Sequence, residues 1–178
     1  MAALFSIRTA ALSDIAAIAA IYGHHVQHGV ASFETEPPSL TEMARRQASL
    51  VEQGYPYLVA VREGAVIGYA YASSYRPRLA YRNTVEDSVY LRPDATGAGV
   101  GSRLLAALIE ACEARGFRQM VAIIGDSANL PSIRLHERHG FRLIGTLASV
   151  GYKHGRWLDT VLMQRNLGPG DGAPPASA

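Results

Sequence analysis

A glycine-rich turn between a predicted strand and a predicted helix is the segment with the clearest chemical potential. Gly97, Gly99 and Gly101 alternate with small residues after an apolar strand that ends at Leu91. Glycine lacks the Cβ atom that would keep a ligand away from the backbone, and a helix beginning near Gly101 offers unpaired N–H groups and the positive end of its dipole. The pattern predicts a binding site for a pyrophosphate group.

Two common phosphate-binding motifs do not fit this turn. A P-loop has Lys followed by Ser or Thr after its last glycine, whereas Ser102 and Arg103 follow Gly101 here. A dinucleotide-binding fingerprint has the spacing Gly-x-Gly-x-x-Gly and lies in an opening strand-helix-strand unit. The turn in this chain has a different glycine spacing and lies in the middle of the chain. A cradle for the pyrophosphate of a pantetheine cofactor is the interpretation that remains.

Residues 96–101 resemble the Arg/Gln-x-x-Gly-x-Gly/Ala signature of the GCN5-related N-acetyltransferases, the GNAT family. The resemblance implies acetyl-CoA as co-substrate. Thr96 stands where the family usually has Arg or Gln, which weakens one side-chain contact to phosphate. The residues implied to bind acetyl-CoA are Val89, Tyr90, Leu91, Thr96, Gly97, Ala98, Gly99, Val100, Gly101, Ser102, Asn129 and Ser132.

Three further segments resemble the branch of this family that acetylates phosphinothricin and methionine sulfoximine. They are residues 84–90, 129–137 and 151–159, of which the last is the most discriminating. This resemblance implies that the acceptor is the α-amino group of a small amino acid whose side chain carries a phosphinate, sulfoximine or sulfone group.

Amine acetylation requires a base, because an ammonium group must lose a proton before its nitrogen attacks a thioester. Glu86, in the strand before the turn, is the predicted general base. Backbone N–H groups around Tyr90 are predicted to stabilise the oxyanion if a bulge leaves them unpaired. His136 stands where many relatives have tyrosine and is a candidate acid or sulfur contact, the alternative being a structural histidine bonded to the backbone.

Planar guanidinium groups suit the carboxylate and the tetrahedral side chain of such an acceptor. Arg76 and Arg78, with Arg82 as a third candidate, are the predicted donors, and simple solvation at the surface is the alternative for each. The other predicted substrate-binding residues are Phe33, Tyr81, Thr84, Val85 and Lys153. No metal site is predicted, because no carboxylate clearly accompanies His24, His25 and His28.

Length and composition favour one enzyme domain. The chain has 178 residues, of which 48% are hydrophobic, and a formal net charge of +2. No Lys/Arg run exceeds two residues, so no nucleic-acid partner is predicted. The apolar stretches are too short to cross a membrane and no signal-peptide pattern opens the chain, so we expect a cytoplasmic protein with no membrane partner. The single cysteine, Cys112, excludes an internal disulfide.

The elements that position these residues follow the order β-α-α-β-β-β-α-β-α-β-β, which predicts an α+β fold with a mixed, mostly antiparallel sheet flanked by helices. Ser39 and Glu42 predict a capping box. A GNAT domain is expected over residues 4–166, and the Gly/Pro/Ala-rich residues 167–178 are expected to be a disordered tail. The predicted strands cover residues 6–8, 57–62, 65–74, 84–91, 119–124, 142–150 and 158–164, and the helices begin near residues 13, 39, 101 and 131.

Two other functions stay open on sequence grounds. The same fold could acetylate a peptide N-terminus or a polyamine, which an open acidic groove would favour. A catalytically idle acyl-CoA-binding module is the alternative from another class, motivated by Thr96. The branch resemblance and the apolar C-terminal hairpin predict a homodimer, with Trp157 in the core or at the interface.

Overall fold

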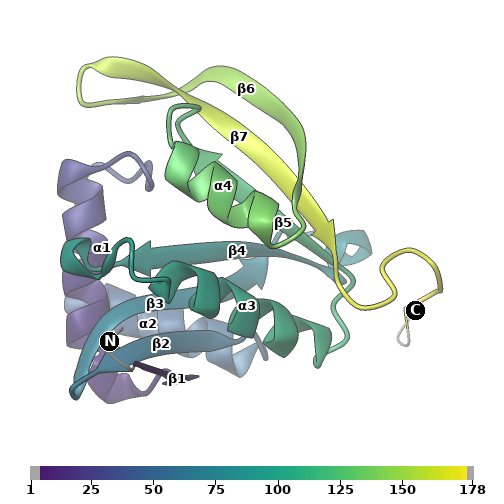
Figure 1. The fold of residues 1–178 in the computed structure, drawn as a ribbon, viewed down its shortest axis with the longest axis horizontal. Coiled ribbons are helices and arrows are strands. Elements are labelled where there is room, and N and C mark those ends of the chain that lie inside the picture. Colours follow the sequence, from purple (N-terminus) through teal and green to yellow (C-terminus); the bar gives the residue numbers. More distant parts are fainter. Residues whose placement is uncertain (1–4, 176–178) are drawn as a thin grey trace.

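The computed structural model describes residues 5–175 and arranges them as strands and helices in the predicted order (Figure 1). The strands are β1 (Ser6–Thr9), β2 (Tyr57–Arg62), β3 (Ala65–Ser74), β4 (Thr84–Leu91), β5 (Gln119–Gly125), β6 (Arg142–Lys153) and β7 (Arg156–Asn166). The helices are α1 (Ile15–His28), α2 (Leu40–Glu52), α3 (Val100–Glu113) and α4 (Leu130–Arg138), with short 3-10 turns at Leu12–Asp14, Leu79–Tyr81 and Pro93–Ala95.

The strands form one sheet in the order β1-β2-β3-β4-β5-β7-β6. Every neighbouring pair is antiparallel except β4 and β5, which run parallel. A connection between parallel strands needs a crossover, and α3 supplies it. The predicted α+β fold class with a mixed, mostly antiparallel sheet is confirmed.

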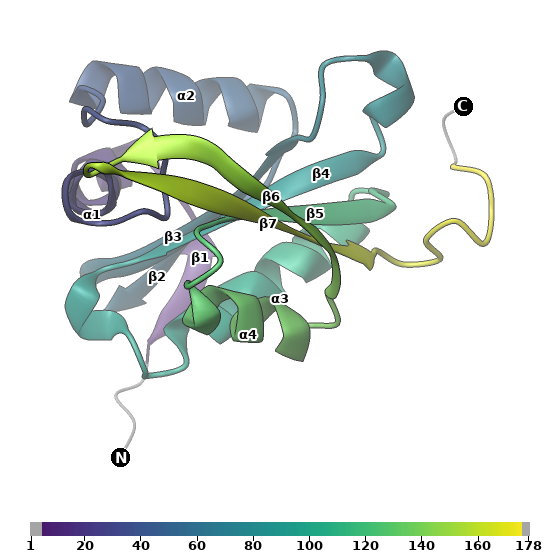
Figure 2. The ribbon, with the colours of Figure 1, turned by 90° about the horizontal axis from the view of Figure 1, so that it is seen from above.

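Helices cover both faces of the sheet, with α1 and α2 on one side and α3 and α4 on the other (Figure 2). Side chains alternate between the faces along each strand. In β3, Tyr69 joins the cluster under α1 and α2, whereas Ala70 joins the cluster under α3. Cys112 is fully buried in the α3 cluster with a free thiol. The sheet therefore separates two apolar cores.

The last two strands are longer than predicted because they meet in a tight hairpin. The turn residues His154 and Gly155 have φ values of 50° and 74°. Two consecutive residues with positive φ match the right-handed twist of the flanking strands, so pairing continues up to the turn. The hairpin arches over α4 (Figure 1).

One predicted cap forms only in part. The Ser39 side chain accepts a hydrogen bond from the Glu42 N–H at 3.2 Å, as an N-cap should. The Glu42 carboxylate binds the guanidinium groups of Arg45 and Arg46 instead of the Ser39 backbone. Two charged partners on the same helix compete with the reciprocal half of the capping box.

The segment after β7 lies against the domain. Leu167 is fully buried, and Arg118 donates hydrogen bonds to the carbonyl groups of Gly170, Ala173 and Pro174. These contacts lie inside the range predicted as a disordered tail. Residues 4 and 176–178 of the two predicted ranges lie outside the described residues.

Candidate active site

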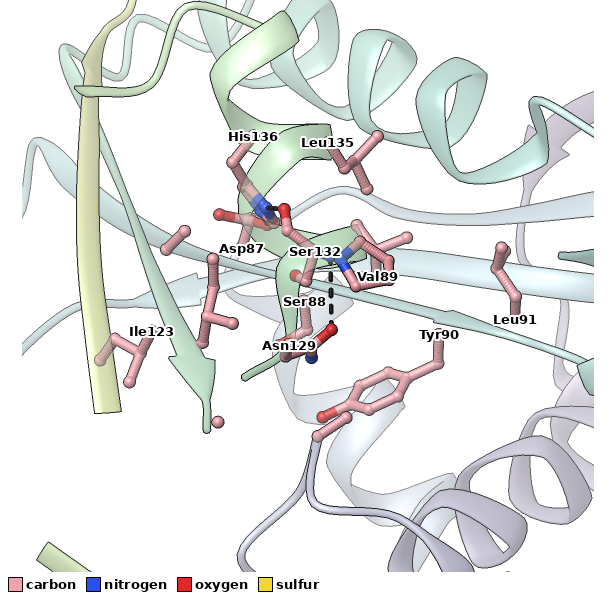
Figure 3. A pocket seen from close by; sticks show the side chains of 15 residues that line it. Asp87, Ser88, Val89, Tyr90, Leu91, Ile123, Asn129, Ser132, Leu135 and His136 are labelled. Atoms are coloured by element: carbon pink, nitrogen blue, oxygen red, sulfur yellow. Dashed lines mark hydrogen bonds and ion pairs between the residues drawn. The ribbon is translucent and has the colours of Figure 1, made fainter. Parts of the chain in front are cut away.

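A slot opens where β4 and β5 separate. Their parallel pairing joins Thr84–Asp87 to Gln119–Ala122 and ends there. Beyond this point the strands enclose a cavity of about 190 Å³ (Figure 3). Its lining includes the predicted residues Val89, Tyr90, Leu91, Asn129, Ser132 and His136. Predicted residues from β4 and from the region of α4 thus meet around one cavity, and β5 lines it with residues that were not predicted.

The backbone of β4 presents free polar groups to this slot. At the two ends of the β3–β4 ladder, Arg92 N–H donates to the Ile67 carbonyl and Tyr75 N–H donates to the Thr84 carbonyl. Bonded and non-bonded pairs alternate in an antiparallel ladder, so the N–H groups of Val89 and Leu91 point away from β3 and toward the slot.

The prediction of a bulge near Tyr90 is wrong, since the register between β3 and β4 is unbroken. The unpaired donors come from the departure of β5. By the same alternation, the Tyr90 N–H points toward β3, so the donors on either side of it are the ones available.

His25 fixes the end of β4 at the slot. Its Nε2 lies 2.7 Å from the Leu91 carbonyl oxygen, and because a carbonyl only accepts, this nitrogen carries the proton. Burial lowers the pKa of His25, which favours the neutral ring. No sequence signal singled out this contact, because it joins α1 to a strand far along the chain.

The glycine turn has the geometry of an anion cradle. Gly97 and Gly99 have φ values of 78° and 77°, and a Cβ at either position would meet nothing within 4 Å. The helix starts at Val100, so its first N–H groups have no partner within the helix and face the turn. The Thr96 hydroxyl donates to the Pro93 carbonyl at 2.9 Å, and the Ser102 hydroxyl bonds to His139 at 2.8 Å. Backbone groups, more than these hydroxyls, are therefore open to a phosphate.

Glu86 lies on the opposite face of β4 from Asp87, on the side of α1 and α2. Its side chain is half-buried. Burial, first, and the neighbouring Asp87, second, raise the pKa of Glu86 to about 7, against the opposing charge of Arg76. A carboxylate with this pKa exchanges protons near neutral pH, as a general base must.

His136 and Asp87 form a buried pair on the other face of β4 (Figure 3). His136 Nδ1 lies 2.8 Å from the Ser132 carbonyl and Nε2 lies 2.9 Å from Asp87 Oδ2. The carbonyl requires a proton on Nδ1, so a second proton is held between Nε2 and the carboxylate. Burial alone would lower the pKa of His136, but the hydrogen bond and the charge of Asp87 raise it.

Comparison with known proteins agrees with this geometry. Residues 7–162 match the family described as "Acetyltransferase (GNAT) domain". The chain belongs to the GNAT acetyltransferase family.

Relatives of this GNAT chain include acetyltransferases with two kinds of name. A phosphinothricin N-acetyltransferase of Alcaligenes faecalis is 55% identical over 166 residues, covering 93% of this chain and 84% of that protein. An L-methionine sulfoximine/L-methionine sulfone acetyltransferase of Pseudomonas paraeruginosa is 46% identical, covering 95% of this chain and 98% of that protein. The crystal structure of a phosphinothricin acetyltransferase from Sinorhizobium meliloti in complex with AcCoA has a TM-score of 0.95 and 50% identity, covering 100% of this chain and 95% of that one.

Asn129 caps the helix that carries His136 in this GNAT chain. Its Oδ1 accepts a hydrogen bond from the Ser132 N–H at 3.3 Å (Figure 3). Asn129 is therefore the N-cap of α4. Asn129 also lines the cavity, and a side-chain amide is suited to the amide groups of pantetheine.

The discriminating motif of residues 151–159 ties the GNAT hairpin to the loop between α1 and α2. A Cβ on Gly151 would stand 2.7 Å from Phe33 Cδ2, so the ring of Phe33 occupies the space that a side chain would need. Lys153 is buried and its Nζ donates to the Ser32 carbonyl at 2.7 Å. Asp159 accepts from Ser127 on the other side. The motif thus forms the surface against which the Phe33 ring packs.

The remaining predicted substrate residues of this GNAT chain lie in the loop between β3 and β4 and at the start of β4. Arg76 lies over the Tyr75 ring at 5.1 Å, Tyr81 packs edge-on against the same ring, and Arg78 stands at the start of the Leu79–Tyr81 turn. Arg82 donates to the Leu79 carbonyl at 3.3 Å in the same loop. Thr84 shares the face of Glu86, whereas the side chain of Val85 is fully buried under α3 and its backbone lies in the paired part of β4 and β5.

The imidazole rings of His24 and His28, at the end of α1, pack against each other. His24 and His28 have centroids 5.0 Å apart. Within residues 5–175, no group of three or more His, Cys, Asp or Glu side chains is placed to hold a metal ion. That the reaction needs no metal stays a prediction.

Proposed function

We propose that this protein transfers an acetyl group from acetyl-CoA to the α-amino group of a small amino acid whose side chain carries a sulfone, sulfoximine or phosphinate. The observation that carries the proposal is the slot between β4 and β5, because the same strand β4 lines the slot, leads into the glycine turn after Leu91 and carries Glu86, whose pKa is about 7. The names of the relatives from Alcaligenes faecalis and Pseudomonas paraeruginosa favour the same acceptor class.

The residues present fit acetyl-CoA. The open space at Gly97 and Gly99 and the first N–H groups of α3 suit the pyrophosphate. The free N–H groups of Val89 and Leu91 and the amide of Asn129 suit the pantetheine arm and the thioester carbonyl. Bound acetyl-CoA supplies an activated acetyl thioester.

The reaction is a direct transfer in a ternary complex. Glu86 accepts a proton from the acceptor ammonium, directly or through one water, and the freed amine attacks the thioester carbonyl carbon. A C–N bond forms, the C–S bond breaks, and backbone N–H groups of β4 stabilise the oxyanion between these events. The thiolate leaves and takes up the second proton that the nitrogen loses on becoming an amide. Arg76 and Arg78 are the proposed donors to the acceptor carboxylate or side-chain oxygens.

An acceptor panel tests the proposal. Release of free CoA thiol would be followed with methionine sulfone, methionine sulfoximine, phosphinothricin, spermidine and an N-terminal peptide. We expect turnover of the amino-acid analogues only. Turnover confined to spermidine or the peptide would contradict the acceptor class, and acetyl-CoA binding without any turnover would favour a non-catalytic acyl-CoA-binding module.

His136 is proposed to place its positive charge near the leaving sulfur. Both ring nitrogens are already bonded, so the ring stabilises developing thiolate charge without giving up the Asp87 contact. The thiolate is a weak base, so we expect His136→Gln to lower kcat only about tenfold, less than the roughly 10²–10⁴-fold that a general acid or base typically contributes. A pre-steady-state measurement of the chemical step checks this, and an unchanged rate would leave His136 with a structural role only.

A homodimer is proposed through the hairpin. The pair Tyr152 and Trp157 are cross-strand partners with ring centroids 5.2 Å apart, and both are more than half exposed. A concentration of exposed apolar side chains on one element favours an interaction site there. The exposed apolar residues of the hairpin are Leu143, Ile144, Leu147, Val150, Tyr152 and Trp157.

Trp157→Glu is expected to convert the dimer to a monomer, because the new carboxylate would be desolvated without a partner at the interface. Light scattering coupled to size-exclusion chromatography measures the mass. Leu12→Asp, at a residue 70% exposed outside the hairpin, is the matched control and should leave the dimer intact. A wild-type monomer, or a dimer that survives Trp157→Glu, would contradict this interface.

We infer a cytoplasmic location. Burial raises the pKa of the free Cys112 thiol to about 12, and an unpaired thiol suits a reducing compartment. Within the described part of the chain, no helix is long and apolar enough to cross a bilayer. Cell fractionation that placed the protein in an exported or membrane fraction would contradict this location.

A further inference from the structure

A second cavity lies on the face of the sheet that carries Glu86. It has a volume of about 320 Å³, which is large enough for an amino-acid side chain. It lies between α1, α2 and the strands β2 and β3. Its lining includes Arg46, Leu50, Tyr57, Tyr69, Tyr71 and Ser73.

Three tyrosines form a rigid aromatic wall of this cavity. The ring of Tyr57 stacks on Tyr71 at 5.0 Å and on Tyr69 at 5.9 Å. Tyr69 and Tyr71 are two residues apart on β3, so both face α1 and α2. Met43 and Leu50 of α2 add apolar surface opposite them. Such walls favour a ligand whose side chain has an apolar stem.

The hydroxyl of Tyr69 lacks a partner. The side chain is 0% exposed, and its oxygen makes no hydrogen bond to any described residue. A buried polar group without a partner is unfavourable, so an acceptor atom brought by a ligand would satisfy it. Burial holds the pKa of Tyr69 well above its ordinary value, so the hydroxyl keeps its proton and donates.

The cavity adjoins the base. Ser73 lines the cavity and is the direct cross-strand partner of Glu86. Side chains of opposite residues in an antiparallel pair lie on the same face, with Cβ atoms about 5 Å apart. An amino acid whose amine is held at Glu86 can therefore place its side chain in the cavity that Ser73, Tyr71 and Tyr69 line.

The arginines at the cavity are already neutralised. Arg46 binds Glu34 at 2.6 Å and Glu42 at 2.8 Å, and Arg45 also binds Glu42. No net positive charge is left to favour an anionic side chain. The chemistry of the cavity suits an uncharged oxygen at the end of an apolar stem.

We propose that this tyrosine-lined cavity is the side-chain pocket of the acceptor and that the Tyr69 hydroxyl donates a hydrogen bond to an uncharged side-chain oxygen, as in a sulfone. The identity of the acceptor rests on the proposed function. The pocket would discriminate a sulfone from a thioether, which lacks the oxygen.

The test compares Tyr69→Phe with wild type, using methionine sulfone and methionine as probes. Binding would be measured by calorimetry in the presence of CoA, and kcat/KM by thiol release. We expect Tyr69→Phe to weaken methionine sulfone binding about tenfold, in line with the loss of one hydrogen bond, and to change methionine binding less than twofold. Tyr55→Phe is the matched control, since Tyr55 stacks on Phe117 and does not line the cavity.

Two readouts separate this proposal from the proposed function. The melting temperature of Tyr69→Phe should equal or exceed that of wild type, because no intramolecular bond is lost. Equal weakening of both probes, no weakening, or no binding of methionine sulfone to wild type would overturn the pocket. Sulfone binding that depends on Tyr69, without any CoA release, would support the pocket and overturn the transferase proposal.

Discussion

Glu86→Gln lowers kcat/KM for the amino-acid acceptor by about 10²–10⁴-fold, the range typical of a lost general base. The substitution keeps the size of the side chain and removes only its capacity to take a proton. The measurement is thiol release from acetyl-CoA at saturating cofactor, with Glu52→Gln at the exposed end of α2 as control. Full activity in Glu86→Gln would remove Glu86 from the mechanism.

The pH profile carries a second signature of the same residue. Burial and Asp87 raise the pKa of Glu86 to about 7, and the base works only when deprotonated. In wild type, kcat/KM should therefore fall about tenfold per pH unit below pH 7. That limb should be absent from the residual activity of Glu86→Gln. A limb of the same midpoint in both proteins would assign the titration to another group.

Gly151→Ala is expected to disturb the acceptor site through Phe33. The added methyl group would stand 2.7 Å from Cδ2 and 3.1 Å from Cζ of that ring, closer than packed atoms tolerate. Overpacking of this kind costs about 1–3 kcal/mol. We expect that loss in the free energy of unfolding and a rise in KM for the acceptor, with KM for acetyl-CoA nearly unchanged. Denaturant titration and steady-state kinetics measure both effects.

The same strand offers a matched control and a rescue. Gly145 also lies in β6, and a Cβ there would meet nothing within 4 Å, so Gly145→Ala should not destabilise the protein. In a Phe33→Ala background, adding Gly151→Ala should cost no further free energy of unfolding, because the ring that the new methyl group would clash with is gone. Additive losses in the double variant would show that Gly151 is required for another reason.

The strands and helices could be predicted from local sequence patterns alone. The alternation in β4 fixes Val85 and Asp87 on one face and Glu86 on the other, and the alternate glycines mark the turn into α3. These are properties of neighbouring residues and their backbone preferences. The sequence by itself therefore determined the order of the elements, the cradle and the candidate base.

The tertiary structure decided how those parts cooperate. The departure of β5 from β4 frees the N–H groups of Val89 and Leu91, where sequence reasoning expected a bulge. The bond between His136 and Asp87 joins residues 49 positions apart, and that between Lys153 and the Ser32 carbonyl joins residues 121 apart. The unpartnered Tyr69 hydroxyl also depends on packing between distant elements. Such features follow from how strands diverge and side chains pack in three dimensions, which the periodicity of a single chain does not encode.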